Sequence, residues 1–312
     1  MAHLLKADSI DFIAYERMTE TAHKVRHASD FFDDVVAEFR DRENGVRHPS
    51  MTSTKAKGVL QFRPSEVTAW SGYNGHRKSM FTSQVALDLC ASEQRTLIAS
   101  FEMSPGKTLA RMARQASATA QPSERWLQSF SQWTRNRLWI FDHMGRVSPE
   151  MVIGLCRYFA KELKGRQVFI DSMMMVCASE DHLDEQKQFV TDLCRVAQET
   201  GLHIHLITHA RKPQSGSEER PPSKYDIRGS AAVSDQVDNV VTVWQDKKKK
   251  SELERDPFNE EWLCKPDALV TVEKQRNGDW EGRMQMWFHS PGLRFSDTRS
   301  CPVDAYELET LL

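Results

Sequence analysis

The sequence predicts an α/β protein in which helices cover a mostly parallel central sheet. From Gly58 onward, short apolar segments alternate with amphipathic ones, as they do when each strand is followed by a helix that crosses back over the sheet. A glycine-rich turn, Gly72–Ser79, stands between a predicted strand and a predicted helix. Several other apolar segments end on a polar residue, at the edge where open parallel sheets bind their ligands.

The composition narrows the class of protein. The chain has 312 residues, 39% hydrophobic and 28% charged, which suits one large α/β domain with a smaller appendage. Its net charge of −2 means that any nucleic-acid binding would rest on local patches of positive charge. Six scattered cysteines without a C-x-x-C pair argue against a zinc site or a disulfide framework. No apolar run is long enough for a signal peptide or a membrane span, so we expect a cytoplasmic protein without membrane contact.

We expect residues 1–55 to form an N-terminal helical arm and linker, residues 56–298 the main α/β domain, and residues 299–312 a C-terminal tail. One helical pattern runs from Ile10 to Val25. A second follows Ser29, where an apolar stripe stands opposite charged residues; its members are Phe31, Phe32, Val35, Val36 and Phe39. The stripe either packs on its own domain or docks on a neighbouring subunit.

The elements of the main domain follow from local patterns. Predicted strands cover 66–70, 96–100, 138–141, 167–171, 203–209, 239–244, 268–274, 282–289 and 293–296. Helices are predicted to begin near Lys78, at Ser104-Pro105, at Ser148-Pro149 and near Asp184, with a short one within 229–238. Residues 247–266 are a charged insertion, in which the Lys247–Lys250 run is expected to be solvated, with a DNA contact as the second choice.

The turn Gly72–Ser79, with the sequence GYNGHRKS, has the context of a P-loop. In such a turn, backbone N–H groups surround an anion, the lysine adds positive charge and the serine hydroxyl holds Mg²⁺. One position departs from G-x-x-x-x-G-K-[ST], because Arg77 stands where the pattern has glycine. Its guanidinium must crowd the phosphate path, add charge beside the phosphates or point out of the loop. The alternative is an ordinary strand-to-helix turn that happens to hold these residues.

Three polar residues at other strand ends support the nucleotide interpretation. Asp171 is placed to support Mg²⁺ beside Ser79, or else to cap a following helix. Glu102 is placed to act as general base for an attacking water, or else is a solvated loop residue. His209 is placed to sense a γ-phosphate. Its alternative is a zinc cluster with His203 and His205, which no fourth ligand or cysteine spacing supports.

The order of five motifs resembles the hexameric replicative DNA helicases of the DnaB type, most closely those of phages and prophages. The motifs are SFEMS (100–104), VFIDS (168–172), LITHARK (206–212), DIRGSAAVSDQVDNVV (226–241) and EKQRNG (273–278). The resemblance covers roughly Gly58 to Ser296. It implies a RecA-like core, a six-membered ring around single-stranded DNA, and hydrolysis of ATP or another NTP with Mg²⁺ between subunits.

The resemblance also assigns roles by position. It places the nucleotide at Gly72, Gly75, Arg77, Lys78, Ser79 and Met80, with Ser79 and Asp171 supporting Mg²⁺. Glu102 would activate water, and His209 would couple the γ-phosphate to the DNA-facing loops. The loop that grips the DNA backbone matches Arg228, Gly229, Ser230 and Ala231. Lys274 and Arg276 match the basic pair that reaches into the neighbour's active site, as a trans arginine finger does. From the residues alone, that pair is equally a solvated hairpin edge.

The predicted function is therefore an NTP-driven ring helicase that unwinds DNA in the 5′-to-3′ direction, the direction being implied by the family alone. The implied partners are single-stranded DNA, further copies of this chain packed through the N-terminal arm, a helicase loader and a separate primase. Two alternatives remain: an ATPase-impaired ring that acts as a DNA clamp, and a RecA-like recombinase that forms filaments. Glu102, Lys274 and Arg276 favour the helicase over the recombinase, and only activity separates it from the clamp.

Overall fold

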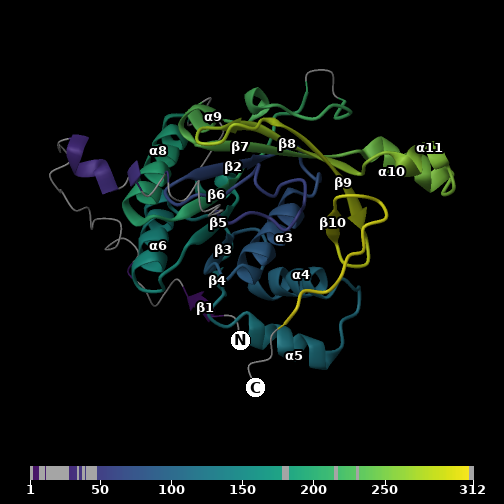
Figure 1. The fold of residues 1–312 in the computed structure, drawn as a ribbon, viewed down its shortest axis with the longest axis horizontal. Coiled ribbons are helices and arrows are strands. Elements are labelled where there is room, and N and C mark those ends of the chain that lie inside the picture. Colours follow the sequence, from purple (N-terminus) through teal and green to yellow (C-terminus); the bar gives the residue numbers. More distant parts are fainter. Residues whose placement is uncertain are drawn as a thin grey trace.

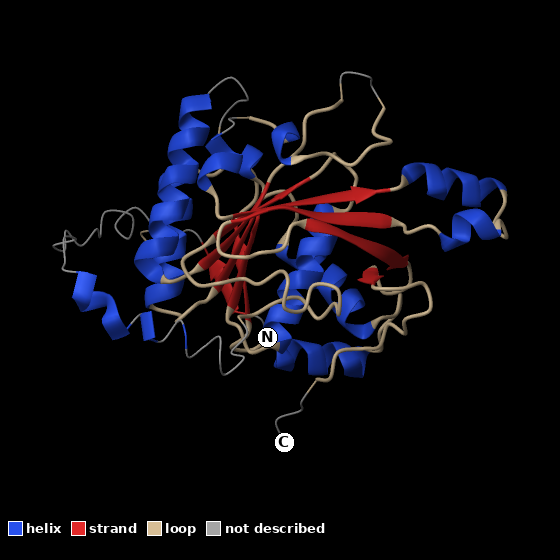
Figure 2. Cartoon of the chain, turned by 45° about the horizontal axis from the view of Figure 1, so that its top comes forward, coloured by secondary structure: helices blue, strands red, loops and turns tan. Residues whose placement is uncertain are grey.

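The computed structural model describes residues 3–6, 11, 28–33, 35–36, 39, 48–177, 183–213, 217–229 and 232–308. Within them, ten strands form one sheet in the order β1-β4-β3-β5-β6-β2-β7-β8-β9-β10 (Figures 1 and 2). The pairs from β1 through β7 are parallel, whereas β8, β9 and β10 extend the sheet in antiparallel pairs. The predicted fold class, a mostly parallel sheet covered by helices, is confirmed.

The strands are β1 (His3–Lys6), β2 (Val67–Ser71), β3 (Thr96–Ser100), β4 (Leu138–Asp142), β5 (Gln167–Asp171), β6 (His203–Ile207), β7 (Asn239–Gln245), β8 (Ala268–Gln275), β9 (Gly282–His289) and β10 (Arg294–Ser296). The helices are α3 (Lys78–Ala91), α4 (Pro105–Ser117), α5 (Glu124–Trp133), α6 (Pro149–Lys161), α7 (Met173–Val176), α8 (Leu183–Thr200), α9 (Ala232–Gln236), α10 (Lys247–Arg255) and α11 (Glu260–Cys264), with 3-10 turns η2 (Ala28–Phe31) and η3 (Lys224–Asp226).

Helices cover both faces of the sheet and enclose two apolar cores (Figure 1). Helices α6, α8 and α9 pack on one face, and α3, α4 and α5 on the other. Successive strand residues point to opposite faces, so Leu97 and Ala99 of β3 join the first core while Ile98 joins the second. Strands buried on both faces explain why the sequence shows continuous apolar runs.

The predicted serine-proline helix starts are confirmed, with one difference in detail. Helices α4 and α6 both have proline at the first turn, directly after Ser104 and Ser148. The Ser148 hydroxyl accepts a hydrogen bond from the Met151 N–H, which satisfies one free donor of the helix terminus. Ser104 has the extended backbone of a capping residue but makes no side-chain bond.

Besides the short elements α7 and η3, four elements have no counterpart among those predicted from the sequence. Strand β1 pairs with β4 at the edge of the sheet. Helix α5 is held by its aromatic residues, because the rings of Trp126, Phe130 and Trp133 stack in succession. The charged insertion folds into α10 and α11, which project away from the sheet (Figure 1). One lysine of the predicted solvated run is buried there: Lys249 is 3% exposed and lies 2.7 Å from the Asp267 carboxylate.

The N-terminal arm is described only in part. The predicted helix from Ile10 to Val25 lies outside the described residues, Asp11 apart. In the second pattern, residues 32, 33, 35, 36 and 39 are helical, and the side chains of Phe32, Val35 and Phe39 are 67%, 51% and 63% exposed. The linker, in contrast, packs on the domain from residue 48 onward, where Met51 is buried. Among the described residues, no helix is long and apolar enough to cross a membrane.

Candidate nucleotide site and DNA-facing loops

The turn after β2 has the close backbone packing that a P-loop requires. Gly72 leaves β2 so near to β7 that an added Cβ would lie 2.2 Å from the Val243 carbonyl oxygen. Any side chain at this position would therefore force the two strands apart. Gly75 lies at the exposed tip of the turn, and α3 begins at Lys78. The Met80 carbonyl, in the first turn of α3, accepts a hydrogen bond from the Gln115 side chain at 2.8 Å.

Arg77 points out of the loop. Its backbone is left-handed, with φ of 61°, which explains why glycine suits this position. The guanidinium carbon lies 3.5 Å from the centre of the Phe288 ring on β9. This placement keeps the side chain off the inside of the turn. The sequence left three orientations open for the guanidinium. The structure has the one that points out of the loop and leaves the phosphate path open.

Lys78 is a buried cation held by uncharged groups. Its Nζ donates to the carbonyls of Gly72 and Tyr73 at 2.8 and 2.9 Å, and lies 3.2 Å from Nδ1 of His209. Burial lowers the pKa of Lys78 to about 8, although Asp171, Glu102 and Glu218 act in the opposite direction. Among the described residues no carboxylate contacts this buried ammonium, an arrangement that fits a site built for phosphate.

Ser79, Asp171 and Glu102 lie together beside Lys78. Ser79 and Asp171 face the same small cavity. Burial, with the nearby Glu102, raises the pKa of Asp171 above its ordinary value, while Ser79, Arg111 and Lys78 oppose the shift. Glu102 is exposed at the end of β3, and its Oε1 accepts from the buried Ser172 hydroxyl at 3.0 Å. A hydroxyl and a carboxylate side by side are oxygen ligands that suit Mg²⁺.

His209 is placed beside the P-loop by backbone pairing and is uncharged. The N–H groups of Thr208 and Ala210 donate to the carbonyls of Trp70 and Gly72 at 2.8 and 2.9 Å. Burial, with the positive charges of Lys78 and Arg228, lowers the pKa of His209 to about 4. Because Nδ1 accepts from the lysine, the proton of the neutral ring is on Nε2.

The zinc alternative for the histidines is wrong for the part of the chain that the structure describes. His203 contacts the Arg63 carbonyl and the Thr68 hydroxyl through its two ring nitrogens, at 2.6 and 2.8 Å. His205 uses both of its ring nitrogens as well, with Trp70 and Gln167. Within the described ranges, no three His, Cys, Asp or Glu side chains are placed to hold a metal ion.

Arg111 is a member of the site that the sequence analysis did not predict. It lines a cavity of about 10 Å³ together with Ser79 and Asp171. Its Nη1 lies 3.3 Å from the Met103 sulfur, and its buried Nε has no hydrogen-bond partner among the described residues. Its position in the chain could have pointed to this role, because Arg111 lies two turns into the helix that follows Glu102.

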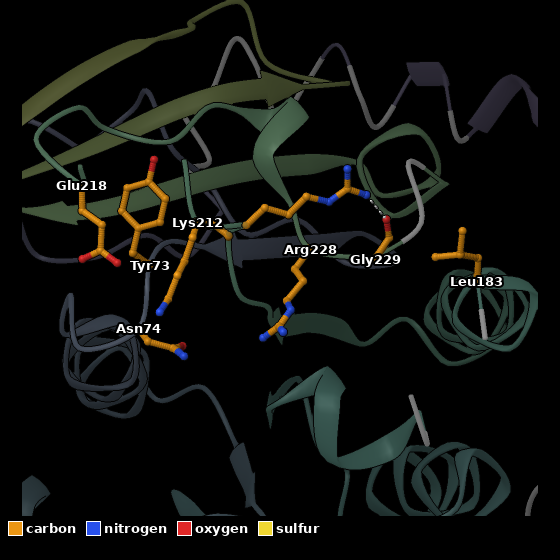
Figure 3. Close-up of a pocket in the computed structure, with 9 residues that line it drawn as sticks. Tyr73, Asn74, Leu183, Lys212, Glu218, Arg228 and Gly229 are labelled. Atoms are coloured by element: carbon orange, nitrogen blue, oxygen red, sulfur yellow. Dashed lines mark hydrogen bonds between the residues drawn. The ribbon is translucent and has the colours of Figure 1, made fainter. Parts of the chain in front are cut away.

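A cleft of about 480 Å³ separates the P-loop from the predicted DNA-facing loop (Figure 3). Asn74 lines it from the P-loop, and Lys212 and Arg228 extend into it from the other side. The guanidinium of Arg211 donates to the Gly229 carbonyl at 2.7 Å and holds that loop to the end of β6. Of the four predicted DNA-binding residues, Arg228 and Gly229 lie at this cleft, and Ser230 and Ala231 lie outside the described residues.

Lys274 and Arg276 lie at the opposite end of the strands from the P-loop. Gln275, between them, pairs with Asn239, the first residue of β7, whereas the P-loop follows the last residue of β2. The Lys274 ammonium donates to the carbonyls of Ser234, Asp235 and Val237 at 2.8–2.9 Å. The Arg276 guanidinium lies 2.9 Å from the Asp238 carboxylate. The structure therefore separates this pair from the residues that it brings together around Lys78.

The fold and the arrangement around Lys78 define a P-loop nucleoside triphosphatase with a RecA-like core. The chain belongs to the AAA domain family, whose model matches residues 54–215. Its fold is similar to that of a solved ATPase domain, with 17% identity and a TM-score of 0.70 over 86% of this chain and 98% of that one. It is also similar to a DnaB-like replicative helicase whose structure was described with its primase interactions, with 17% identity and a TM-score of 0.69 over 88% of this chain and 68% of that one. The resemblance to DnaB-type helicases, predicted from the motifs, is confirmed at the level of the fold.

Proposed function

We propose that this protein is a ring-shaped DNA helicase that couples NTP hydrolysis to 5′-to-3′ translocation on single-stranded DNA and to duplex unwinding. The observation that carries the proposal is that the residues around Lys78 and the basic pair lie at opposite ends of the strands. Lys78, Ser79, Asp171 and Glu102 lie at one end, and the basic pair Lys274 and Arg276 lies at the other. The pair can serve a nucleotide only if that nucleotide is bound by another subunit, which favours a closed assembly of like subunits.

The proposed chemistry uses side chains that already lie close together. Lys78 would leave the Gly72 and Tyr73 carbonyls and bind phosphate oxygens. Ser79 and Asp171 would hold Mg²⁺, which would supply positive charge to offset that of the phosphates. Glu102, oriented by the Ser172 hydroxyl, would accept the proton of the attacking water. His209 would change its hydrogen bonds when Lys78 moves, and so report phosphate to the segment that ends at Arg228.

The exposed stripe on the N-terminal arm supports the proposed ring. Phe32, Val35 and Phe39 are each more than half exposed within a single chain. Burying such side chains is worth about 1.5–3 kcal/mol each, and a neighbouring subunit offers a surface for it. We propose a homohexamer in which the arm packs on the next subunit, with single-stranded DNA in the channel and with a loader and a separate primase as further partners.

The experiment that tests the proposal is ATP hydrolysis by the purified protein with and without single-stranded DNA. We expect DNA to stimulate hydrolysis, and Lys78→Ala to abolish it. Forked substrates with either a 5′ or a 3′ tail then test unwinding and its direction. Intact DNA binding without turnover would favour the clamp, and DNA-bound filaments in place of discrete hexamers would favour the recombinase.

A further inference from the structure

His76 belongs to the P-loop but is not one of the predicted nucleotide-binding residues, and its side chain is fixed on all sides. The ring of His76 is 1% exposed and packs between Tyr73 and Trp244, with ring centres 5.3 and 6.5 Å away. Its Nδ1 accepts from the Gln245 backbone N–H at 3.1 Å, and its Nε2 lies 3.0 Å from Oε2 of Glu218. Because Nδ1 accepts, the proton is on Nε2, and His76 donates it to the Glu218 carboxylate.

Glu218 connects three separate parts of the molecule. The carboxylate oxygen that accepts from His76 also lies 2.7 Å from the Lys247 ammonium, at the start of α10. The Glu218 carbonyl accepts from the Trp244 indole at 2.8 Å. Hydrogen bonds from Lys247 and His76 lower the pKa of Glu218, so the carboxylate is ionised at neutral pH. One side chain therefore joins the P-loop, the insertion α10–α11 and the segment 217–229.

The segment 217–229 ends in the predicted DNA-facing loop. Its second half is held to the chain that follows β6, because the Arg211 N–H donates to the Asp226 carbonyl and the Arg228 N–H donates to the His209 carbonyl, both at 2.7 Å. Glu218 and Arg228 line the same cleft, from opposite ends of this segment (Figure 3). The segment 217–229 therefore links Glu218 to Arg228 along the chain, and contacts with other parts of the molecule hold it at both places.

We propose that Glu218 is a positioning residue that couples nucleotide occupancy of the P-loop to the DNA-facing segment 217–229, through its hydrogen bond with His76. The coupling rests on the proposed function. It adds a second route from the P-loop to the DNA-facing loop, one that does not use the His209 side chain. The physical reason lies in Lys78, whose ammonium holds the Gly72 and Tyr73 carbonyls and must release them to bind phosphate. Tyr73 packs on His76, so a change in the turn shifts the ring that Glu218 holds.

The test is hydrogen–deuterium exchange of the full chain with and without Mg²⁺ and a non-hydrolysable ATP analogue. We expect the analogue to slow exchange at residues 72–79 and to change it across 217–229 in the unmodified protein. In Glu218→Ala, residues 72–79 still gain protection, but the response of 217–229 is lost. Glu219→Ala is the matched control, because Glu219 is the exposed neighbour in sequence, and it should behave like the unmodified protein.

A second readout separates coupling from general loosening of the segment. The affinity for a single-stranded oligonucleotide should depend on the analogue in the unmodified protein and be independent of it in Glu218→Ala. Lys247→Ala should reduce the effect of the analogue on oligonucleotide affinity, whereas Lys248→Ala should leave that effect unchanged. In the Glu218→Ala background, adding Lys247→Ala should cause no further change. An equal response of 217–229 in Glu218→Ala would overturn the coupling alone. No protection of residues 72–79 in the unmodified protein would overturn the proposed function as well.

Discussion

The guanidinium carbon of Arg77 lies 3.5 Å from the centre of the Phe288 ring, on the outside of the P-loop. A left-handed backbone costs a residue other than glycine roughly 1–2 kcal/mol. A cation above an aromatic face returns about 0.5–2 kcal/mol, depending on how dry the contact is. The two effects are similar in size, so an arginine is tolerated where P-loops have glycine. Phe288 packs on Phe295 of β10, which gives the arginine a fixed surface.

We therefore expect Arg77→Gly to be nearly neutral. The variant loses the ring contact and gains backbone freedom in the unfolded chain, but it also loses the left-handed cost, so its free energy of unfolding should change by less than about 1 kcal/mol. ATP turnover should stay within a few-fold of the unmodified protein. Urea unfolding and steady-state hydrolysis measure the two quantities. Undetectable hydrolysis that Arg77→Gly restores would show that the arginine does block the site.

Nucleotide binding should weaken as the pH rises above 8. The pKa of Lys78 is lowered to about 8 in the nucleotide-free protein, and phosphate favours the charged lysine. The complex then holds a proton that the free protein loses above pH 8, so affinity falls with rising pH, by at most about tenfold per unit. Titration with a fluorescent ADP between pH 7 and 9.5 measures this. Lys78→Arg, whose side chain stays charged, should flatten the curve, and an unchanged slope would assign the proton to another group.

Glu102→Gln should abolish most hydrolysis while leaving nucleotide binding intact. A general base contributes typically about 10²–10⁴-fold to a rate, and the amide keeps the shape of the side chain without its basicity. Ser172→Ala should lower turnover less, because it removes the hydroxyl that orients Glu102 and leaves the carboxylate in place. Turnover and fluorescent nucleotide affinity, measured on both variants, separate catalysis from binding. Full activity of Glu102→Gln would remove Glu102 from the role of base.

The parts of the site that the sequence predicted are those set by local pattern. A strand, a glycine-rich turn and Lys78-Ser79 at a helix start are neighbours in the chain, so their geometry follows from short-range rules. Glu102 and Asp171 could be placed because the ends of parallel strands meet at one edge of the sheet. The orientation of Arg77 could not, because it depends on Phe288, which is distant in sequence.

The missed features depend on contacts between distant segments. Helix α5 has a serine cap and an apolar stripe at helical spacing, but its place in the fold depends on Trp133, which packs against Tyr306 near the end of the described chain. Lys249 looks like its three lysine neighbours, and only the folded insertion places it beside Asp267. Arg111 and Glu218 carry no motif. Each is recognised only when the fold brings it to Asp171 or to His76.

His209→Gln should retain most of the DNA-stimulated activity. The lowered pKa of His209, about 4, means that the ring is neutral at physiological pH: its Nδ1 accepts from Lys78, and its Nε2 carries an N–H that can donate. Glutamine offers both functions without a charge. His209→Ala, which offers neither, should lose stimulation by DNA while binding nucleotide. The ratio of turnover with and without single-stranded DNA is the measurement, and equal loss in both variants would indicate a role that only imidazole fills.

Mixed assemblies test whether Lys274 and Arg276 act on a neighbour. A Lys78→Ala subunit keeps the basic pair but has no working P-loop, and a subunit with Lys274→Ala and Arg276→Ala has the reverse. Each should be inactive alone, whereas a mixture should recover part of the hydrolysis at junctions that join an intact P-loop to an intact pair. The pair also holds α9 through the Ser234 carbonyl, and the turn after α9 through the Asp238 carboxylate. Asp238→Asn, which weakens that contact and spares the basic pair, is the control for structural loss. A mixture as inactive as its parts, with Asp238→Asn equally inactive, would assign the pair to holding α9 within its own subunit.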